Sequence, residues 1–336
     1  MNDGLSHIHD TFHSLKGELG KHIIGQDKLI DLLIITMFSG GHALLEGVPG
    51  LGKTKTIREL SYILDLSFKR VSFTPDLLPS DVVGAEIYKP AKSEFMIRKG
   101  PIFTHILLAD EINRTPPKVQ SALLEAMEEK QVTIAEESLD LPKPFFVFAT
   151  QNPLEHEGTY PLPEAQLDRF FMKIILDYPH PDDEKKIFEQ EAKTSQKKEK
   201  TKLKITSTDI IEMIEYIEKN IYVDPKIYDY VSQIIGATRA LSTQKGSLKY
   251  LEENGVDVPM NVLDYGASTR AGLALIRGSR VLAVLQGREN VLPEDIKFLV
   301  PVVCAHRIGL SYEAIGEGID VYELIDWILD TVVIPS

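Results

Sequence analysis

Gly47-Val48-Pro49-Gly50-Leu51-Gly52-Lys53-Thr54 is a stretch that fits the pattern G-x-x-x-x-G-K-[ST] of a phosphate-binding loop. The residues before it, 42–46, are apolar enough for a buried strand, and residues 55–64 after it carry apolar side chains at helical spacing. A strand, a glycine loop and a helix form the context that this motif requires. The alternative is a glycine-rich turn that contains Lys-Thr by accident, and the flanking elements count against it. The stretch therefore predicts a nucleotide-binding site.

The residue types of this loop suit a bound triphosphate. Glycines allow backbone N–H groups to curl around an anion, and the N-terminus of the following helix adds partial positive charge. Lys53 can reach the β- and γ-phosphates, and the hydroxyl of Thr54 can ligate Mg²⁺. We therefore expect the nucleotide to be bound by Gly47, Val48, Pro49, Gly50, Leu51, Gly52, Lys53, Thr54 and Lys55.

The composition is that of a soluble globular protein, because 43% of the 336 residues are hydrophobic and 26% are charged. This length predicts two or three domains. The sequence has no apolar run of roughly 18 residues and no signal-peptide pattern at its start, so no membrane span is expected. The single cysteine, Cys304, can form no internal disulfide, which fits a reducing cytoplasm. The net charge of −13 argues against a protein that coats nucleic acid, although it does not exclude a local basic channel.

Strands alternate with helices over the first 180 or so residues, which predicts a mostly parallel α/β sheet. The expected strands are 42–46, 68–73, 105–111, 145–150 and 171–176. The expected helices are 1–20, 28–39, 55–64 and 119–130. Two further pairs of short β-like segments, 85–88 with 94–98 and 132–134 with 138–141, predict hairpins.

After residue 181 the pattern becomes helical. The lysine-rich run 193–202 indicates a solvated linker, with an interaction site as the weaker alternative. Helices are expected at 182–192, 209–219 with Thr208 as its cap, 225–240, 268–285, 293–304 and 322–332. The predicted organisation is a phosphate-loop α/β core with N-terminal helices at 1–192, a linker at 193–206 and a smaller all-helical lid domain at 207–336.

Two adjacent carboxylates, Asp110 and Glu111, end the third expected strand. In an open α/β sheet the carboxyl edge of the strands faces the ligand crevice. One carboxylate there can orient Mg²⁺ while its neighbour polarises an attacking water as general base. The alternative is a polar strand end that serves solubility, but the phosphate loop earlier in the chain favours the functional interpretation.

Three further polar residues can each have either a structural or a catalytic role, and their positions in the sequence do not decide between the two. Asn152, just after the fourth strand, can hold the water or the γ-phosphate, or it can simply form a turn before Pro153. Arg169 can pair with Asp168 or reach a neighbouring subunit's γ-phosphate. Arg270, at the start of the long helix of the second domain, can reach the phosphates from there.

This combination of features resembles the MoxR-type AAA+ ATPases. The segments that carry the resemblance are the phosphate loop, Phe73-Thr74-Pro75-Asp76-Leu77-Leu78-Pro79-Ser80-Asp81, Asp110-Glu111-Ile112-Asn113-Arg114, Gln120-Ser121-Ala122-Leu123-Leu124-Glu125-Ala126-Met127-Glu128-Glu129, Ala149-Thr150-Gln151-Asn152-Pro153, Leu162-Pro163-Glu164-Ala165-Gln166-Leu167-Asp168-Arg169-Phe170 and Gly266-Ala267-Ser268-Thr269-Arg270-Ala271. The resemblance as a whole extends from about residue 25 to residue 306 and so covers nearly the whole chain.

The resemblance implies an ATPase that binds ATP and Mg²⁺ and works as a homo-oligomeric ring of six subunits. It assigns the Walker A role to Lys53 and Thr54, the metal ligand of Walker B to Asp110 and the catalytic base to Glu111. It also makes Asn152 the sensor 1 residue, Arg270 the sensor 2 arginine and Arg169 a finger that acts on the next subunit, with Ile24 and Gly25 near adenine. The two hairpins would face the ring pore and touch substrate.

Members of this family resemble chaperones that mature or activate proteins, commonly with partners that contain a von Willebrand factor A domain. The first hypothesis is therefore ATP-driven remodelling, maturation or activation of a partner protein. A nucleic-acid-stimulated AAA+ motor is the alternative, which the acidic balance and the lack of an aromatic-basic cluster disfavour. A small-molecule kinase would not need the second domain or the set of Asn152, Arg169 and Arg270. A related ATPase that drives metal insertion into a tetrapyrrole remains close to the first hypothesis.

Overall fold

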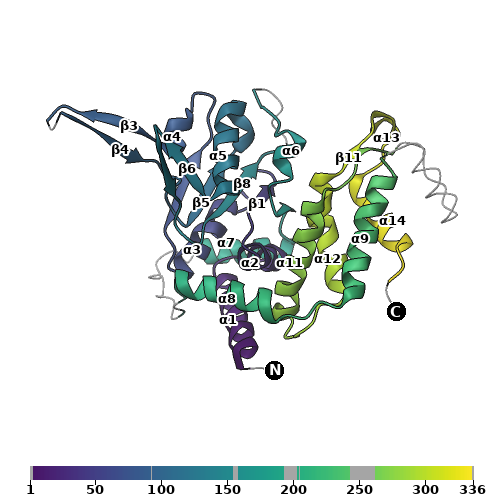
Figure 1. Cartoon of the computed structure of the whole chain (residues 1–336). Coiled ribbons are helices and arrows are strands. Elements are labelled where there is room, and N and C mark those ends of the chain that lie inside the picture. Colours follow the sequence, from purple (N-terminus) through teal and green to yellow (C-terminus); the bar gives the residue numbers. More distant parts are fainter. Residues whose placement is uncertain are drawn as a thin grey trace. The chain divides into compact units, whose positions relative to one another are not determined.

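The computed structural model describes residues 3–91, 93–153, 158–192, 203, 205–242 and 262–334 (Figure 1). Contacts within the chain group it into two compact units. The core unit comprises Asp10–Arg169 and Ile174–Ile214, and the lid unit comprises Met1–His9, Phe170–Lys173 and Glu215–Ser336. These units interleave along the chain, whereas the sequence suggested contiguous domains at 1–192 and 207–336. Residues 193–202 and 204 of the expected linker lie outside the described residues, so the domain limits remain a proposal.

A five-stranded sheet organises the core unit. Its strand order is β2-β5-β8-β1-β9, and the neighbours β2–β5, β5–β8 and β1–β8 are parallel. The strands are β1 (Ala43–Glu46), β2 (Phe68–Ser72), β5 (Ile106–Asp110), β8 (Phe146–Gln151) and β9 (Met172–Ile175). The five predicted strands are confirmed, with ends that differ by a residue or two.

Burial of the central strands explains their apolar sequences. Residues 106–109 of β5 and 146–150 of β8 are all buried, as expected for a parallel sheet that is covered on both faces. Ser72 pairs with Asp110 and Glu46 pairs with Gln151, so four strands end along the same edge. The segments that follow β1, β2, β5 and β8 therefore meet at the carboxyl edge of the sheet, where α/β proteins bind their ligands.

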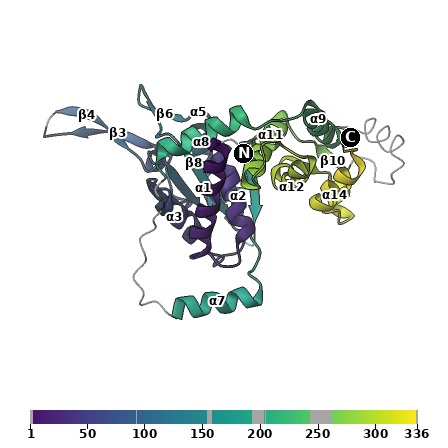
Figure 2. The same cartoon turned by 90° about the horizontal axis from the view of Figure 1, so that it is seen from below.

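Helices α3 and α5 lie on opposite sides of this sheet (Figure 2). The helices of the first 192 residues are α1 (Asp3–Gly20), α2 (Asp27–Phe38), α3 (Lys53–Ile63), α4 (Pro79–Val83), α5 (Pro117–Glu129), α6 (Glu164–Leu167) and α7 (Pro181–Ala192), with a 3₁₀ turn η1 at Ile112–Arg114. The short helices α4 and α6 were not expected. Among the described residues, no helix is both long and apolar enough to cross a bilayer.

Both predicted hairpins are present. Strands β3 (Gly84–Lys89) and β4 (Glu94–Lys99) form one, and β6 (Gln131–Ile134) and β7 (Glu137–Asp140) form the other, each as a separate antiparallel sheet. The β3–β4 hairpin projects away from the five-stranded sheet (Figure 1). Its outer half carries large apolar side chains on both strands, because Ile87 pairs with Met96 and Tyr88 pairs with Phe95.

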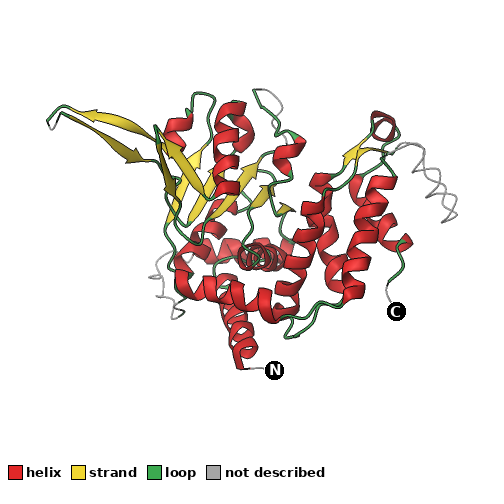
Figure 3. Ribbon diagram, viewed as in Figure 1, coloured by secondary structure: helices red, strands yellow, loops and turns green. Residues whose placement is uncertain are grey.

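The lid is helical, as expected, with one small addition (Figure 3). Its helices and those leading into it are α8 (Ser207–Asn220), α9 (Pro225–Ala240), α11 (Thr269–Leu285), α12 (Pro293–Cys304), the 3₁₀ turn η2 (Ala305–Arg307), α13 (Tyr312–Gly316) and α14 (Val321–Thr331). The addition is an antiparallel pair of very short strands, β10 (Leu263–Tyr265) and β11 (Gly309–Leu310). Helix α11 packs against α9 and α12, and its apolar residues form the centre of the lid core.

The cap expected for α8 is wrong by two residues. The helix begins at Ser207, so Thr208 lies inside its first turn. Thr206 Oγ1 instead accepts a hydrogen bond from Asp209 N at 3.2 Å, and Asp209 Oδ2 accepts one from Thr206 N at 2.7 Å. This reciprocal arrangement is a capping box, which uses Asp in the place of the usual Glu or Gln.

The lid core also buries the single cysteine. Cys304 ends α12, and burial raises the pKa of its thiol to about 12. A thiol that stays protonated is a poor nucleophile, so Cys304 is a small apolar core residue.

Candidate functional site

The phosphate loop connects β1 to α3, and its glycines are required by the backbone. Gly50 and Gly52 have φ angles of 92° and 77°, in the left-handed region that L side chains avoid. A Cβ on Gly47 would lie 2.9 Å from Leu176 O, so only glycine allows this close approach. Helix α3 begins at Lys53, which turns the free N–H groups of its first turn toward the loop.

Lys53, the first residue of α3, reaches back to the first residue of the loop. Its Nζ donates a hydrogen bond of 2.5 Å to Gly47 O. Burial lowers the pKa of Lys53, while the nearby carboxylates of Asp110, Glu111 and Glu46 oppose that shift. A half-buried ammonium group gains from an anionic ligand, because the ligand replaces the water that burial removed. The electrostatic setting of Lys53 therefore favours phosphate.

A cavity of about 360 Å³ borders the loop and brings several of the predicted site residues together. It is lined by Pro49, Gly50, Leu51, Gly52, Lys53, Thr54, Lys55, Arg70, Asp110, Glu111, Thr150 and Asn152. Lys53, Thr54, Asp110, Glu111 and Asn152 were all expected here from the sequence, although they come from three different strand ends. The register of β2, β5, β8 and β1 accounts for this juxtaposition.

Asp110 is held by two residues that the sequence interpretation did not single out. Its Oδ1 accepts a hydrogen bond of 2.6 Å from Thr150 Oγ1, and its Oδ2 accepts one of 3.0 Å from Arg70 Nε. Arg70 Nη2 donates to the same oxygen. Thr150 Oγ1 also accepts a hydrogen bond of 2.9 Å from Glu111 N, so one hydroxyl orders both members of the carboxylate pair.

The sequence predicted that Glu111 would end the strand together with Asp110. In the structure β5 ends at Asp110, and Glu111 lies just beyond it. Its φ and ψ of 58° and 51° are left-handed, and a 3₁₀ turn begins at the next residue. A non-glycine residue in this conformation costs of the order of 1 kcal/mol, and such strain is concentrated at functional sites. The turn lets Glu111 share the cavity with Asp110, although consecutive residues of a strand point to opposite faces. Glu111 Oε2 also forms an ion pair of 3.0 Å with Arg114 Nη1.

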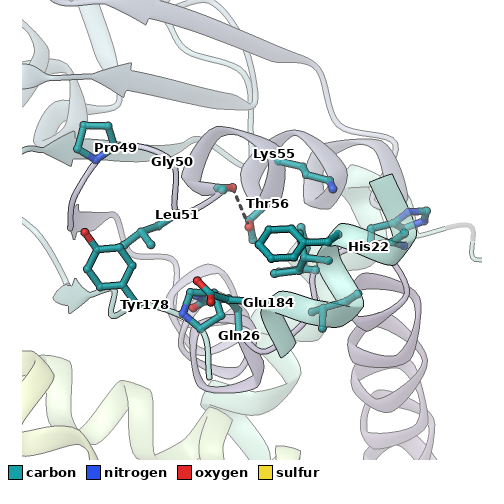
Figure 4. A pocket seen from close by; sticks show the side chains of 16 residues that line it. His22, Gln26, Pro49, Gly50, Leu51, Lys55, Thr56, Tyr178 and Glu184 are labelled. Atoms are coloured by element: carbon teal, nitrogen blue, oxygen red, sulfur yellow. Dashed lines mark hydrogen bonds between the residues drawn. The ribbon is translucent and has the colours of Figure 1, made fainter. Parts of the chain in front are cut away.

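A second cavity, of about 390 Å³, also borders the loop (Figure 4). It is lined by His22, Ile23, Ile24, Gln26, Pro49, Gly50, Leu51, Gly52, Lys55, Thr56, Tyr178, Pro179, Glu184, Ile187, Phe188 and Gln190. Figure 4 shows Leu51 and Tyr178 on one side of this cavity, His22 on the other, and Gln26 and Glu184 between them. Both cavities include the loop from Pro49 to Gly52, so one ligand can extend from one into the other.

The second cavity has the character of a site for a flat heterocycle, with apolar walls and a few polar groups. Ile24 lines it, as the family resemblance implied. Gly25 does not line it but fixes the turn between two residues that do. Gly25 has a φ of 72°, and a Cβ there would lie 2.8 Å from the Cβ of Asp183 on α7. Only glycine therefore fits this turn against α7.

Two arginines remain among the predicted site residues, Arg169 and Arg270. Within the described part of the chain, Arg169 lines neither cavity. Its Nη2 forms an ion pair of 3.1 Å with Glu128 Oε2 on α5. Arg270 belongs to the lid unit, where it occupies the first turn of α11 and its backbone N donates to the cap residue Ser268 at 3.1 Å. The ion pair with Glu128 adds an acidic partner that the sequence did not suggest for Arg169.

A divalent cation suits the oxygen donors of the phosphate cavity. Mg²⁺ is commonly bound by one or two protein oxygens, together with water and substrate phosphates. Thr54 and Asp110 supply such oxygens. Within the described part of the chain, no group of three or more His, Cys, Asp or Glu side chains could hold a metal. The ion would therefore be held by Thr54 and Asp110 jointly with a bound nucleotide.

Comparison with known proteins extends these observations. Residues 42–172 match the model of the "ATPase family associated with various cellular activities (AAA)", and residues 261–327 match that of an AAA lid domain. The chain is 39% identical to Chaperone MoxR1 of Mycobacterium tuberculosis over 334 residues, which cover 99% of this chain and 85% of that protein. It is 32% identical to Protein MoxR of Methylorubrum extorquens, with coverage of 97% and 96%. A crystal structure of a protein from Cytophaga hutchinsonii, 42% identical, matches with a TM-score of 0.89 over 99% of this chain and 98% of that one.

Proposed function

The chain belongs to the MoxR-type AAA+ ATPases, and on this basis we propose that it hydrolyses ATP with Mg²⁺ to remodel, mature or activate a partner protein. The observation that supports this proposal best is the pair of cavities that share the phosphate loop as part of their lining. The apolar one accepts the base, and the polar one holds Lys53, Thr54, Asp110, Glu111 and Asn152 around the place of the γ-phosphate.

Each residue of the polar cavity has a distinct task in this proposal. Lys53 binds the β- and γ-phosphates, and bound Mg²⁺ would neutralise phosphate charge beside Thr54 and Asp110. Glu111 accepts the proton of the attacking water, since it shares the polar cavity with Asp110, the carboxylate assigned to the metal. Asn152, buried in the wall of the cavity, orients that water through its amide.

A homo-oligomeric ring, for which we propose six subunits, completes the site. A γ-phosphate in the polar cavity needs a cation that stabilises the charge of the transition state. Arg169 does not line that cavity in its own subunit, so we assign it to the nucleotide of the neighbouring one, and Arg270 to the phosphates of its own. We place this machine in the cytoplasm, with a von Willebrand factor A domain as the type of protein partner.

The β3–β4 hairpin supplies a surface for that partner. Tyr88 and Phe95 are 52% and 67% exposed, and their ring centroids are 5.2 Å apart. Large apolar side chains that remain in water at the end of a projecting hairpin gain free energy when a partner covers them. We therefore assign partner contact to this hairpin, whose movement would follow hydrolysis.

The test is a trap made with Glu111→Gln. This variant should bind ATP with unchanged affinity while hydrolysis falls by about 10²- to 10⁴-fold, the usual contribution of general base catalysis. With Mg²⁺ and ATP present, affinity capture from a cell extract should enrich a protein partner. Glu129→Gln, which removes an exposed carboxylate at the end of α5, is the matched control and should hydrolyse ATP normally.

Phe95→Ser in the Glu111→Gln background separates partner contact from nucleotide binding. It should retain ATP and lose the partner. Capture of nucleic acid alone, with hydrolysis stimulated by added DNA, would contradict the proposal and favour a nucleic-acid motor. Undiminished hydrolysis by Glu111→Gln would contradict the catalytic assignment.

A further inference from the structure

Two adjacent lid residues bind the backbone immediately after Arg169. His306 Nε2 donates a hydrogen bond of 3.2 Å to Phe170 O, and Arg307 Nη1 donates one of 3.1 Å to Phe171 O. Arg307 Nη2 also donates to Phe170 O. Two consecutive carbonyl groups are thus held by three donors from η2, the turn that follows α12.

Burial makes these hydrogen bonds hard to replace. His306 and Arg307 are only 6% and 5% exposed, and Phe170 is fully buried. His306 is neutral, because burial and the charge of Arg307 lower its pKa well below the usual value. Its single ring proton therefore lies on Nε2, since Nδ1 has no hydrogen-bond partner among the described residues. Leaving a buried guanidinium without one of its acceptors costs free energy. The hydrogen bonds of Arg307 to residues 170 and 171 therefore form a rigid attachment.

The attachment lies where the chain passes between the two units. Phe170–Lys173 groups with the lid unit, whereas Arg169 groups with the core unit, where its side chain pairs with Glu128. One peptide bond therefore joins a residue held by the lid to the arginine assigned to the neighbouring nucleotide. A change in the lid that moves Phe170 must also move the backbone of Arg169.

We propose that His306 and Arg307 are positioning residues, which make the placement of Arg169 on the neighbouring subunit's ATP depend on the lid. This inference rests on the proposed action of Arg169 between subunits. The lid can sense nucleotide because α11 carries Arg270 in its first turn, and α11 packs against α12, which continues into η2. ATP bound by one subunit thus influences hydrolysis in the next through α11, α12 and residues 170–171.

Two sets of variants isolate the hydrogen bonds from the packing. His306→Gln keeps a donor near the position of Nε2, whereas His306→Phe keeps the ring and removes the donor. Arg307→Lys keeps the charge and loses the fork that reaches two carbonyls at once. We expect His306→Phe and Arg307→Lys to reduce ATP turnover per subunit at least fivefold, and His306→Gln to reduce it less than twofold. Affinity for a fluorescent ATP analogue should stay within twofold of wild type in all three.

Mixed rings supply a measurement that simple damage would not affect. A Glu111→Gln subunit cannot hydrolyse its own ATP but presents an intact Arg169 to its neighbour. When Glu111→Gln subunits are added to Arg307→Lys or His306→Phe subunits, ATP turnover per lid-variant subunit should rise at least threefold. The same mixture with Arg169→Ala subunits is the reference, because Arg169→Ala removes the finger itself.

These outcomes separate the inference from the function on which it rests. If Glu111→Gln restores Arg169→Ala but neither lid variant, the positioning role is wrong while the intersubunit role of Arg169 stands. If it fails to restore Arg169→Ala, the intersubunit role is wrong and the inference is overturned with it. Should Arg307→Lys not fold, equal turnover by His306→Phe and His306→Gln overturns the inference.

Discussion

Arg70 Nε donates a hydrogen bond of 3.0 Å to Oδ2 of Asp110, so a cation of the chain lies on the carboxylate proposed as the Mg²⁺ ligand. Arg70 belongs to the edge strand β2 and its side chain is half exposed, which allows it to move away. Arg70 and a divalent cation cannot both use this oxygen at full strength. The ion pair therefore competes with the metal.

Arg70→Gln should lower the Mg²⁺ concentration at which ATP binding is half-maximal. A partly exposed ion pair contributes about 0.2–1 kcal/mol, so the expected decrease is about 1.5- to 5-fold. Titration of Mg²⁺ against a fluorescent ATP analogue measures it. Lys69→Gln removes the same charge from the adjacent exposed position of β2 and should leave the midpoint unchanged. An unchanged or higher midpoint in Arg70→Gln would mean that Arg70 helps to bind nucleotide instead.

Arg169 should make ATP hydrolysis depend on assembly. If it acts on the next subunit, activity per subunit rises with protein concentration between nanomolar and micromolar levels. Arg169→Ala should reduce the plateau by a factor of the order of 10³, as for other arginine fingers. Arg58→Ala, which changes an exposed arginine on α3, serves as the control. A flat concentration dependence, together with full activity of Arg169→Ala, would refute the intersubunit site.

Gly25→Ala should weaken ATP binding through the shape of the base cavity. Its methyl group would meet Asp183 at 2.8 Å and so displace α7, whose residues form one wall. Gly40→Ala is the matched control, because Gly40 has a similar φ of 67° but open space around a Cβ. Both variants should lose about 1 kcal/mol of stability from backbone strain. Only Gly25→Ala should raise the dissociation constant of ATP, by about tenfold. Equal dissociation constants for both variants would show that this turn does not contribute to binding of the base.

The sequence alone was sufficient to predict the parallel sheet and most of the polar cavity. The phosphate loop identifies β1, and the carboxyl ends of parallel strands must share one edge, so Asp110 and Asn152 could be placed near Lys53. The hairpins also followed from local alternation. These features depend on short-range patterns and on one topological rule.

Features that depend on tertiary contacts could not be predicted in the same way. Arg70 and Thr150 reach Asp110 only because β2 and β8 flank β5, an order that the sequence does not state. The base cavity joins the loop to residues 178–190, more than a hundred positions away. The strands β10 and β11 span three and two residues, too few to show an alternating pattern. Thr150 had one available signal, since a hydroxyl at the end of a buried strand needs a partner.

His42 gives the core unit a pH dependence of its stability. It is buried beside β8, where its Nδ1 accepts a hydrogen bond of 3.0 Å from Val147 N and its Nε2 donates one of 3.2 Å to Met127 O. Burial lowers the pKa of His42 from 6.5 to about 4. Between these values the unfolded chain binds a proton that the folded chain does not, so stability is complete above pH 6.5 and falls as the pH falls toward 4.

Each pH unit in this window should cost about 1.4 kcal/mol of unfolding free energy from His42 alone. His42→Asn keeps an acceptor for Val147 N and cannot titrate, so its unfolding free energy should depend less steeply on pH. Urea unfolding at pH 7, 6 and 5, followed by circular dichroism, measures both slopes. Part of the slope should remain, because burial also lowers the pKa values of His306 and His105. His180→Asn, which changes an exposed histidine of the same unit, is the control and should not reduce the pH dependence of the unfolding free energy. Equal slopes for wild type and His42→Asn would exclude His42 as the titrating group.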